Sequence, residues 1–547
     1  MTGYFQLLLP ELILGTVACV LMLLGCSMKV AIRKLVPILA LVALIAVFAI
    51  QLGRQGSDNT SARTLTDISG TFRIFHFAQY IKSLVAGVGI MLLLLAWPTN
   101  AEGTGNNALN VGQETGEFFG LMLLSLCGIF LVAGANDIIL LFLGIELASI
   151  PTYIMVSISR PNPVAQEAGV KYFFLGAMSA AIMLFGFSYL YGTTGSIKLD
   201  QISQLLHPQS TVSGLVASTF ESDPAQAAIQ PWVLLAVIML VVGFAFKIAA
   251  VPLHVYAGDV YQGAATPVTA FLSFVPKTSG FVALIKILYA AGGPAWALPT
   301  QLSKLLWVLA VLTMTFGNVL GLLQTNLKRL LAYSSVAHSG YMLTGIAALS
   351  GAYLTAGRDR NDVQTDALAG VIFYLTAYGI MNAAAFGVLM LLPARDGRPG
   401  TSAETFEDIA GQGRRHVGLG LCMAVACFSL IGIPLTVGFW GKVFLIKPAF
   451  AGGNNWLVII VMVNAAISAA YYLRIVATMF LRDPVMDAVQ PAGDAKFPFP
   501  IAAAIGLSVT GTLLLGTVLP VTQVFTSSTH IAARIDDGHE SVRFEAK

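Results

Sequence analysis

Charged residues are scarce in this sequence. Asp, Glu, Lys and Arg make up only 10% of the 547 positions, whereas 56% are hydrophobic. A soluble globular domain carries about 25% charged residues, so this chain is too apolar to cover a water-facing surface. That excludes an ordinary cytosolic enzyme. The 30 Lys and Arg nearly balance the 27 Asp and Glu, and the net charge of +3 offers no basic field for nucleic acid.

Motifs that hold metals or nucleotides are also missing. The five cysteines form no CxxC pair and show no His/Cys ligand spacing, which argues against iron–sulfur, zinc and disulfide-scaffold interpretations. No GxGxxG follows a strand pattern and no GxxxxGK[ST] occurs. We therefore expect no cofactor and no metal in this chain. If it belongs to a redox enzyme, the redox groups lie in other subunits.

Long hydrophobic runs are abundant instead. A membrane-spanning helix needs about 20 mostly apolar residues. The runs predict an all-α polytopic membrane protein of about 14 transmembrane helices. The first run, in MTGYFQLLLPELILG, lacks a positively charged start and a cleavage site, so we interpret it as a retained helix and not a signal peptide. The expected spans are residues 4–26, 35–52, 76–97, 116–134, 137–158, 165–190, 231–257, 265–290, 303–323, 327–349, 365–393, 416–448, 455–480 and 499–520.

The connecting segments predict an orientation. Lys and Arg are more frequent in the alternate loops that begin with the loop after the first span. The positive-inside rule therefore favours termini on the outer, periplasmic side of a bacterial plasma membrane. We expect residues 98–115, 196–230 and 521–547 to form polar loops and a charged tail. Within the second of these, SIKLDQISQLL predicts a short interfacial helix with Leu199, Ile202, Leu205 and Leu206 on one face.

Ionisable residues inside the spans are the candidates for function. A charge at the bilayer centre costs about 2.5–3.5 kcal/mol by the lower estimates, and by default it marks an ion pathway. Glu146 lies in mid-span, within DIILLFLGIELASIPTYIM. Lys171 lies in the next span, and the short connection predicts a Glu146–Lys171 ion pair. The alternative for Lys171 is that it extends to the membrane interface.

Two lysines lie beside predicted helix breaks. Lys247 is followed five residues later by Pro252, which removes a backbone donor. Freed carbonyls at membrane depth are tolerated only inside protein or along a wet cavity, and such a place lets a lysine gain and lose a proton. Lys442 lies eight residues after Pro434 in FSLIGIPLTVGFWGKVFLI and repeats the pattern.

Further candidates lie between these two. Lys277 is deep in its span and follows Pro276, whereas Lys286 is nearer the span end and is interpreted as an interfacial residue. His254 follows the first break and His338 lies within LLAYSSVAHSGYML. Since His titrates near neutrality, each is either a proton carrier or a hydrogen-bonded structural residue.

Matching offsets predict an internal repeat. Lys442 and Lys247 are 195 positions apart, and His338 and Glu146 are 192 apart. We expect two five-helix repeats, helices 4–8 and 9–13. Five is odd, so the copies are inverted, as in many transporters. The expected division is 1–115 for an N-terminal three-helix segment, 116–295 and 296–480 for the two repeats, and 481–547 for helix 14 and the tail.

Four stretches carry a resemblance to a known family. They are LLFLGIELASIPTYIMV with EAGVKYFFLGAMSAAIMLFGFSYLYGTTGSI, FKIAAVPLHVYAGDVYQGAATPVTAFLS, QTNLKRLLAYSSVAHSGYML, and EDIAGQGRRHVGLGLCMAVACFSLIGIPLTVGFWGK. Together they resemble subunit N of respiratory complex I, the proton-pumping NADH:quinone oxidoreductase. The segment VYQGAATPVTAF is more similar to subunit N than to the two larger antiporter-like subunits.

The resemblance implies a role for each candidate. Glu146 matches the fifth-helix glutamate, paired with Lys171 on the sixth helix, and Lys247 matches the broken-helix lysine of the first half-channel. Lys277 matches the connecting lysine, and Lys442 matches the lysine of the second broken helix. His254 and His338 fall on histidines of the polar axis.

The resemblance also implies a translocase subunit driven by quinone reduction elsewhere. FMN, iron–sulfur clusters and quinone are then expected in partner subunits, and other membrane subunits on both sides along the membrane arm. In the implied mechanism, the pairing of Glu146 with Lys171 controls whether Lys247 keeps its proton.

The chain departs from the family pattern at both breaks. Tyr256, Ala257 and Gly258 stand where Trp-x-Pro is usual, and Ala265 stands where a proline is usual. Pro276 beside Lys277 is unusual, and the second break has Leu435 after Pro434 in place of a double proline. These departures concern loop geometry and not the positions of the lysines.

Two other functions fit the same features. A subunit of a multisubunit cation/proton antiporter shares the two-repeat plan, and NADH-dependent activity of the assembly distinguishes it. A lone secondary transporter for an organic solute would work without redox subunits. A purely structural scaffold leaves the deep charges unexplained.

Overall fold

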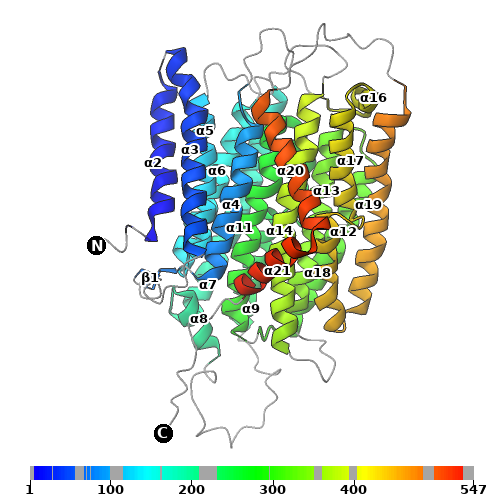
Figure 1. Ribbon diagram of the computed structural model, residues 1–547. Helices are drawn as coiled ribbons and strands as arrows, with labels where there is room; N and C mark the ends of the chain where they lie inside the picture. Colours follow the sequence, from blue (N-terminus) through cyan, green and yellow to red (C-terminus); the bar gives the residue numbers. More distant parts are fainter. Residues whose placement is uncertain are drawn as a thin grey trace, which may run out of the picture.

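The structure is a computed structural model that describes most of the chain. It covers residues 5–533 except 6, 28, 56–66, 69, 74, 99–114, 160–162, 208–230, 295, 350–359, 393–402 and 484–497. The helices stand side by side, and their order along the chain runs broadly from one edge of the bundle, at α2 and α3, to the opposite edge, at α19 (Figure 1).

Helices make up nearly all of the described structure. A two-stranded antiparallel sheet is the exception, formed by β1 (Asp67–Ile68) and β2 (Phe72–Arg73). The helices are α2 (Leu9–Gly25), α3 (Val30–Gln55), α4 (His76–Leu95), α5 (Thr115–Gly134), α6 (Ile138–Ile158), α7 (Pro163–Thr194), α8 (Leu199–Leu206), α9 (Pro231–Lys247), α10 (Ala257–Gly263), α11 (Thr266–Gly292), α12 (Thr300–Leu322), α13 (Leu327–Leu349), α14 (Arg360–Leu391), α15 (Phe406–Ile409), α16 (Gln412–Arg415), α17 (Val417–Ile431), α18 (Val437–Ala451), α19 (Asn455–Leu481), α20 (Phe499–Thr517) and α21 (Leu519–Ala533).

The described helices include many that have the length and composition of membrane spans. Within the described residues, ten helices are long and apolar enough to cross a membrane, or eleven if the bent pair α15–α16 and α17 counts as one span. The expected count of fourteen is thus not reached by this measure. Three expected spans form shorter or interrupted helices, and α13 is long enough, with 23 residues, but less apolar than the ten. The expected spans 231–257 and 416–448 are each interrupted, at Lys247 and after Ile431.

Three helices, α11, α13 and α14, lie almost wholly inside the bundle. The apolar windows of α11 and α14 are completely buried by their neighbours, whereas only a third of the α7 window is buried. A helix that contacts protein on all sides can carry polar residues at membrane depth, since lipid does not reach them. This explains why α11 contains Lys277 and α13, packed beside α14, contains His338.

The first predicted helix break is confirmed. Helix α9 ends at Lys247, and the chain then passes through turns, with Ala249 at a φ of 55°, before α10 begins at Ala257. Pro252 lies within this interruption, as expected from its missing backbone donor.

The second break has a similar construction. Helix α17 ends at Ile431, and Gly432 follows with a φ of 88°, a left-handed conformation that glycine adopts without steric cost. Pro434 and Leu435 lie in the connection, and α18 begins at Val437.

The polar segments agree with expectation only in part. The short helix predicted after residue 196 is confirmed as α8, with Leu199 and Ile202 buried. The prediction of a non-helical tail from residue 521 is wrong up to Ala533, because α21 forms there and packs against α14, α4 and α20 (Figure 1). Its Thr529 and Ala532 are buried, so one face of this polar helix belongs to the bundle. Residues 99–114, 208–230 and 534–547 lie outside the described residues.

Small residues allow α5 and α6 to approach closely. A Cβ atom at Gly128 would lie 2.3 Å from the backbone nitrogen of Ala148 and 2.7 Å from the carbonyl oxygen of Gly144. Backbone atoms cannot move aside as a flexible side chain can. In membranes, such close packing replaces the hydrophobic effect as the source of helix association.

This packing yields a stability prediction. Gly128→Val forces α5 and α6 apart, and overpacking of this kind costs about 1–3 kcal/mol. We expect a lower thermal midpoint and less assembled protein by fluorescence-detected size-exclusion chromatography. Gly506→Val is the matched control, because a Cβ at Gly506 has nothing within 4 Å. Equal midpoints for the two variants would contradict the close packing.

Candidate functional site

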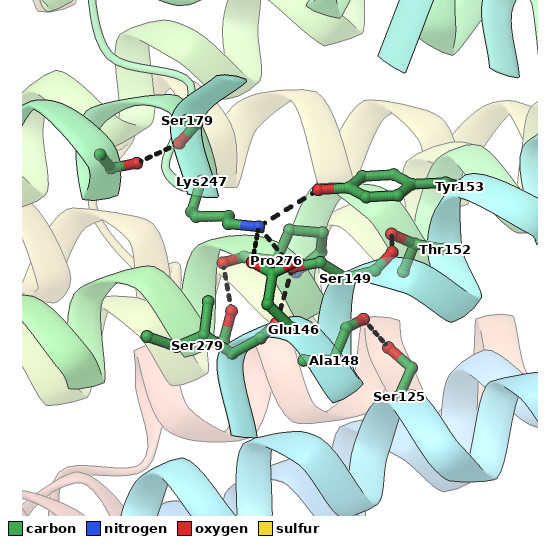
Figure 2. Close-up of polar contacts among 12 residues, drawn as sticks. Ser125, Glu146, Ala148, Ser149, Thr152, Tyr153, Ser179, Lys247, Pro276 and Ser279 are labelled. Atoms are coloured by element: carbon green, nitrogen blue, oxygen red, sulfur yellow. Dashed lines mark hydrogen bonds and ion pairs between the residues drawn. The ribbon is translucent and has the colours of Figure 1, made fainter. Parts of the chain in front are cut away.

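Glu146 and Lys247 form a buried ion pair at the first break. Lys247 is the last residue of α9, and its Nζ lies 3.0 Å from Oε1 of Glu146 on α6. The same Nζ donates hydrogen bonds to the Ser149 hydroxyl at 2.8 Å and the Tyr153 hydroxyl at 3.1 Å (Figure 2). Glu146, Ser149 and Tyr153 are three and four residues apart, so they share one face of α6.

The surroundings of Lys247 stabilise a positive charge on its ammonium group. The Lys247 side chain is 2% exposed and that of Glu146 is 16% exposed. The ammonium lies 5.7 Å from the ring centre of Tyr153 and 6.0 Å from that of Phe246, within cation–π range. Three oxygen acceptors thus replace the water that Lys247 loses on burial.

The predicted Glu146–Lys171 ion pair is wrong. Lys171 instead binds Glu167, at 2.6 Å, and Asp259, at 3.1 Å, and its side chain is 43% exposed. The reason is which face of α7 points into the bundle. Tyr172 packs inward against Tyr153, so the preceding residue points about 100° away, to the outside of the bundle.

Lys171 therefore belongs to a surface cluster. Asp259, on α10, also accepts a hydrogen bond from Arg329 on α13 at 2.7 Å. This cluster links α7, α10 and α13 on the outside of the chain. Of the two predicted alternatives for Lys171, the structure favours the exposed one.

Lys277, on α11, also lies beside the first helix break. Its Nζ donates to the carbonyl of Ile248 at 3.0 Å, to the carbonyl of Ser335 at 3.0 Å and to the hydroxyl of Ser339 at 2.6 Å. Ile248 directly follows Lys247 in the chain. The Ile248 carbonyl beside the first break therefore binds Lys277, which places Lys247 and Lys277 in one polar region.

His338 occupies the middle of the bundle, on α13. Its Nδ1 lies 2.7 Å from the Tyr374 hydroxyl and its Nε2 lies 3.1 Å from the Tyr472 hydroxyl. Tyr472 also forms a short hydrogen bond with Ser334. Because Ser339 follows His338 directly, His338 lies on the same two turns of α13 as Ser335 and Ser339, which bind Lys277.

Lys442 lies at the second break. Its Nζ donates to the carbonyls of Leu430, at 3.1 Å, and Ile431, at 2.6 Å, which end α17. It also lies 4.9 Å from the ring centre of Tyr341. The negative end of a helix dipole and an aromatic face thus take the place that a carboxylate has at Lys247.

Two other predicted residues lie apart from these contacts. His254 is buried, and its ring centre lies 6.5 Å from that of Tyr333. Lys286 donates a hydrogen bond to the carbonyl of Ala135 at 2.6 Å, near the end of α11. No group of three or more His, Cys, Asp or Glu that could hold a metal ion occurs among the residues that the structure describes.

Sequence reasoning missed several polar residues. Ser149 and Tyr153 follow Glu146 at helical spacing, a signal that could have identified them. Glu11 and Lys82 form a buried ion pair at 2.5 Å. Both lie inside expected spans, so the criterion applied to Glu146 would have found them.

A comparison with known proteins identifies the family. Residues 135–468 match the family model described as "NADH:quinone oxidoreductase/Mrp antiporter, TM". NADH-quinone oxidoreductase subunit N from Trichlorobacter lovleyi is 37% identical over 408 residues, covering 74% of each chain. Subunit N 1 from Solibacter usitatus is 31% identical over 510 residues, covering 93% of each chain.

The chain belongs to the NADH-quinone oxidoreductase subunit N family. A solved structure of respiratory complex I from Thermus thermophilus contains a similar chain, with 27% identity and a TM-score of 0.69 over 93% of this chain and 98% of that one. A chain of the Mrp complex from Dietzia has a TM-score of 0.71 at 20% identity, over 97% and 98% of the two chains, and shares the fold. The chain is thus an antiporter-like membrane subunit.

The ion pair yields a prediction that separates the two possible partners of Glu146. Lys247→Met leaves the Glu146 carboxylate without a cation. Removing one partner of a buried ion pair costs about 3–5 kcal/mol, and we expect the lower end because Glu146 is partly exposed. The measurement is the thermal stability of the purified subunit or complex.

Two variants serve as controls for this measurement. The double variant Glu146→Gln/Lys247→Met removes both charges and should recover most of the loss. Lys171→Met should leave stability nearly unchanged, since Lys171 binds carboxylates at the surface. A larger loss for Lys171→Met than for Lys247→Met would contradict the observed pairing.

Proposed function

We propose that this chain is a proton-translocating membrane-arm subunit of NADH-quinone oxidoreductase. Protons move through two linked half-channels along Glu146, Lys247, Lys277, His338 and Lys442, driven by quinone reduction in other subunits. The observation that carries this proposal is the placement of three buried lysines at or beside the carbonyls of two helix breaks.

The first step concerns the Glu146–Lys247 pair. When the Glu146 carboxylate takes up a proton, Lys247 loses its counter-ion but stays buried. An unpaired buried charge is unfavourable, so Lys247 releases its proton towards Lys277, which shares the polar region around Ile248. Lys277 accepts this proton as the neutral amine that remains after its own proton has moved on towards His338. Opposing a membrane potential of 100 mV requires about 2.3 kcal/mol per charge.

The second step concerns the middle of the bundle. Ser339 donates to the Ile248 carbonyl at 2.6 Å and accepts a hydrogen bond from Lys277. Next to it, His338 binds two tyrosine hydroxyls, and imidazole can accept a proton on one nitrogen and release one from the other. Lys442 then receives the proton beside the second break. Lys171 and His254 lie outside these contacts. Lys171 is exposed at the surface of the first repeat, and His254 lies beside the first helix break.

The arrangement of the two halves completes the proposal. The repeats span residues 116–295 and 296–480 in inverted orientation, preceded by an N-terminal segment of residues 1–115 and followed by helix 14 and its tail. The termini face the outside. FMN, iron–sulfur clusters and quinone belong to partner subunits, and membrane subunits adjoin this chain on both sides.

Replacing Lys247 tests the proposal most directly. We expect Lys247→Ala to slow the proton-transfer step by on the order of 100-fold, since a positioned proton carrier contributes at least that much. The measurement is proton pumping by the whole complex in reconstituted vesicles. Lys447→Ala, at a lysine that is 64% exposed, is the matched control. Pumping at the parent ratio of protons to electrons in Lys247→Ala would remove Lys247 from the path.

Replacing Glu146 tests the coupling between charge and turnover. Glu146→Gln keeps the shape of the side chain but removes the charge that holds Lys247. We expect reduced quinone reductase activity under coupled conditions, and recovery when an uncoupler removes the proton gradient. Unaltered coupled activity would count against a switch that depends on this carboxylate.

A further inference from the structure

A second buried ion pair lies outside the proposed axis. Glu11 on α2 and Lys82 on α4 are 2.5 Å apart, and their side chains are 5% and 0% exposed. The Lys82 ammonium lies 4.6 Å from the ring centre of Phe72 and 5.9 Å from that of Phe130. This pair lies in the N-terminal helices, which contain none of the residues of the proposed axis.

Packing stability alone does not account for this pair. Taking two charges out of water costs several kcal/mol per ion, and well-packed apolar residues of similar size are often as stabilising or more so. Oε2 of Glu11 has no hydrogen-bond partner among the described residues, and neither has the amide of Gln51, which is fully buried on the neighbouring α3. Buried polar groups of this kind are normally satisfied by water.

Lys286 binds the backbone segment that pairs with Phe72, the residue beside Lys82. The strand residue Phe72, whose ring faces Lys82, forms a backbone bridge with Ala135. The carbonyl of Ala135 accepts the hydrogen bond of Lys286 at 2.6 Å. Lys82 and Lys286 therefore approach the same short piece of backbone from two sides.

A partly exposed polar cluster of Asn136, Asp200 and Arg73 lies directly beyond Ala135. The next residue, Asn136, donates to Asp200 at 3.0 Å, and Asp200 pairs with Arg73 at 2.8 Å. The Arg73 and Asp200 side chains are 28% and 25% exposed. Since Asp137 caps the start of α6, this polar cluster lies at the end of the helix that carries Glu146.

We propose that Glu11 and Lys82 form a second proton-binding station, which opens through Lys286 to the surface at Arg73, Asp200 and Asn136. The resting pair, ammonium with carboxylate, is neutral. Taking up one proton on Glu11 gives an ammonium and a carboxylic acid with a net charge of +1. Loss of that proton towards the polar cluster restores the pair. The rings of Phe72 and Phe130 stabilise the cation, and Lys286 favours release by repulsion.

This inference rests on the proposed proton translocation and extends it to the N-terminal segment. The test uses the whole complex in vesicles and the double variant Glu11→Gln/Lys82→Met, which removes both charges and keeps side-chain size. We expect the ratio of protons to electrons to fall towards that of Lys247→Ala. Subunit content and uncoupled quinone reductase activity should stay at the parent level, since a merely structural role would change these instead.

The control is a pair to which the proposal assigns no proton. Asp366→Asn/Lys447→Met removes an ion pair of 2.6 Å between α14 and α18 in which Lys447 is exposed. A parent ratio in both double variants would overturn the inference. If the Glu11/Lys82 variant fails to assemble, the variant Lys286→Met is measured instead. It leaves the Glu11–Lys82 pair intact and removes the ammonium group through which the station is proposed to open to the surface. A lowered ratio there supports the station, and a parent ratio overturns it.

The two proposals fail separately. A parent ratio in Lys247→Ala removes the proposed axis. A low ratio in Lys247→Ala with a parent ratio in the Glu11/Lys82 variant leaves that axis intact and removes only the second station.

Discussion

Burial of lysine ammonium groups at membrane depth is the constraint on which this structure depends. Each ammonium must exchange its water for fixed oxygen atoms or aromatic faces, since an unpaired buried charge is unfavourable by several kcal/mol. Most carbonyls inside a regular helix are already hydrogen-bonded within it, although that of Ser335 in α13 also accepts from Lys277. The breaks after Lys247 and Ile431 release carbonyls where they are needed, and the completely buried helices α11 and α14 keep lipid away from them.

The three lysines meet this constraint in different ways. Lys247 has a carboxylate, Lys277 has two carbonyls and a hydroxyl, and Lys442 has two carbonyls and a ring. A carboxylate can be neutralised by a proton, whereas carbonyl dipoles are fixed. In the proposed mechanism, the first site is therefore the place where uptake of a proton changes the electrostatics, and the later sites pass it on.

Much of this could be predicted from the sequence. Long apolar runs, prolines in mid-span and isolated charges are local signals, so the breaks, the lysines and the family resemblance followed from them. The partner of Glu146 did not, because it depends on how α7 is rotated in the bundle. Tyr172 takes the inward position by stacking among Tyr153 and Tyr256, which turns Lys171 outward. No local pattern specifies that rotation.

Other differences have equally physical causes. Helix α21 was not expected because about half of its residues are polar and a charged segment follows it, yet contact with α14, α4 and α20 stabilises it. Glu11 and Lys82 are far apart in the sequence, and only the packing of α2 against its neighbours shows that they form a pair.

The central claim is that the buried lysines form one hydrated path. A density map of the assembled complex at a resolution that shows ordered water tests it most directly. We predict water molecules that connect the Glu146–Lys247 pair with Lys277, His338 and Lys442. Dry apolar packing that separates these groups from one another would contradict the account.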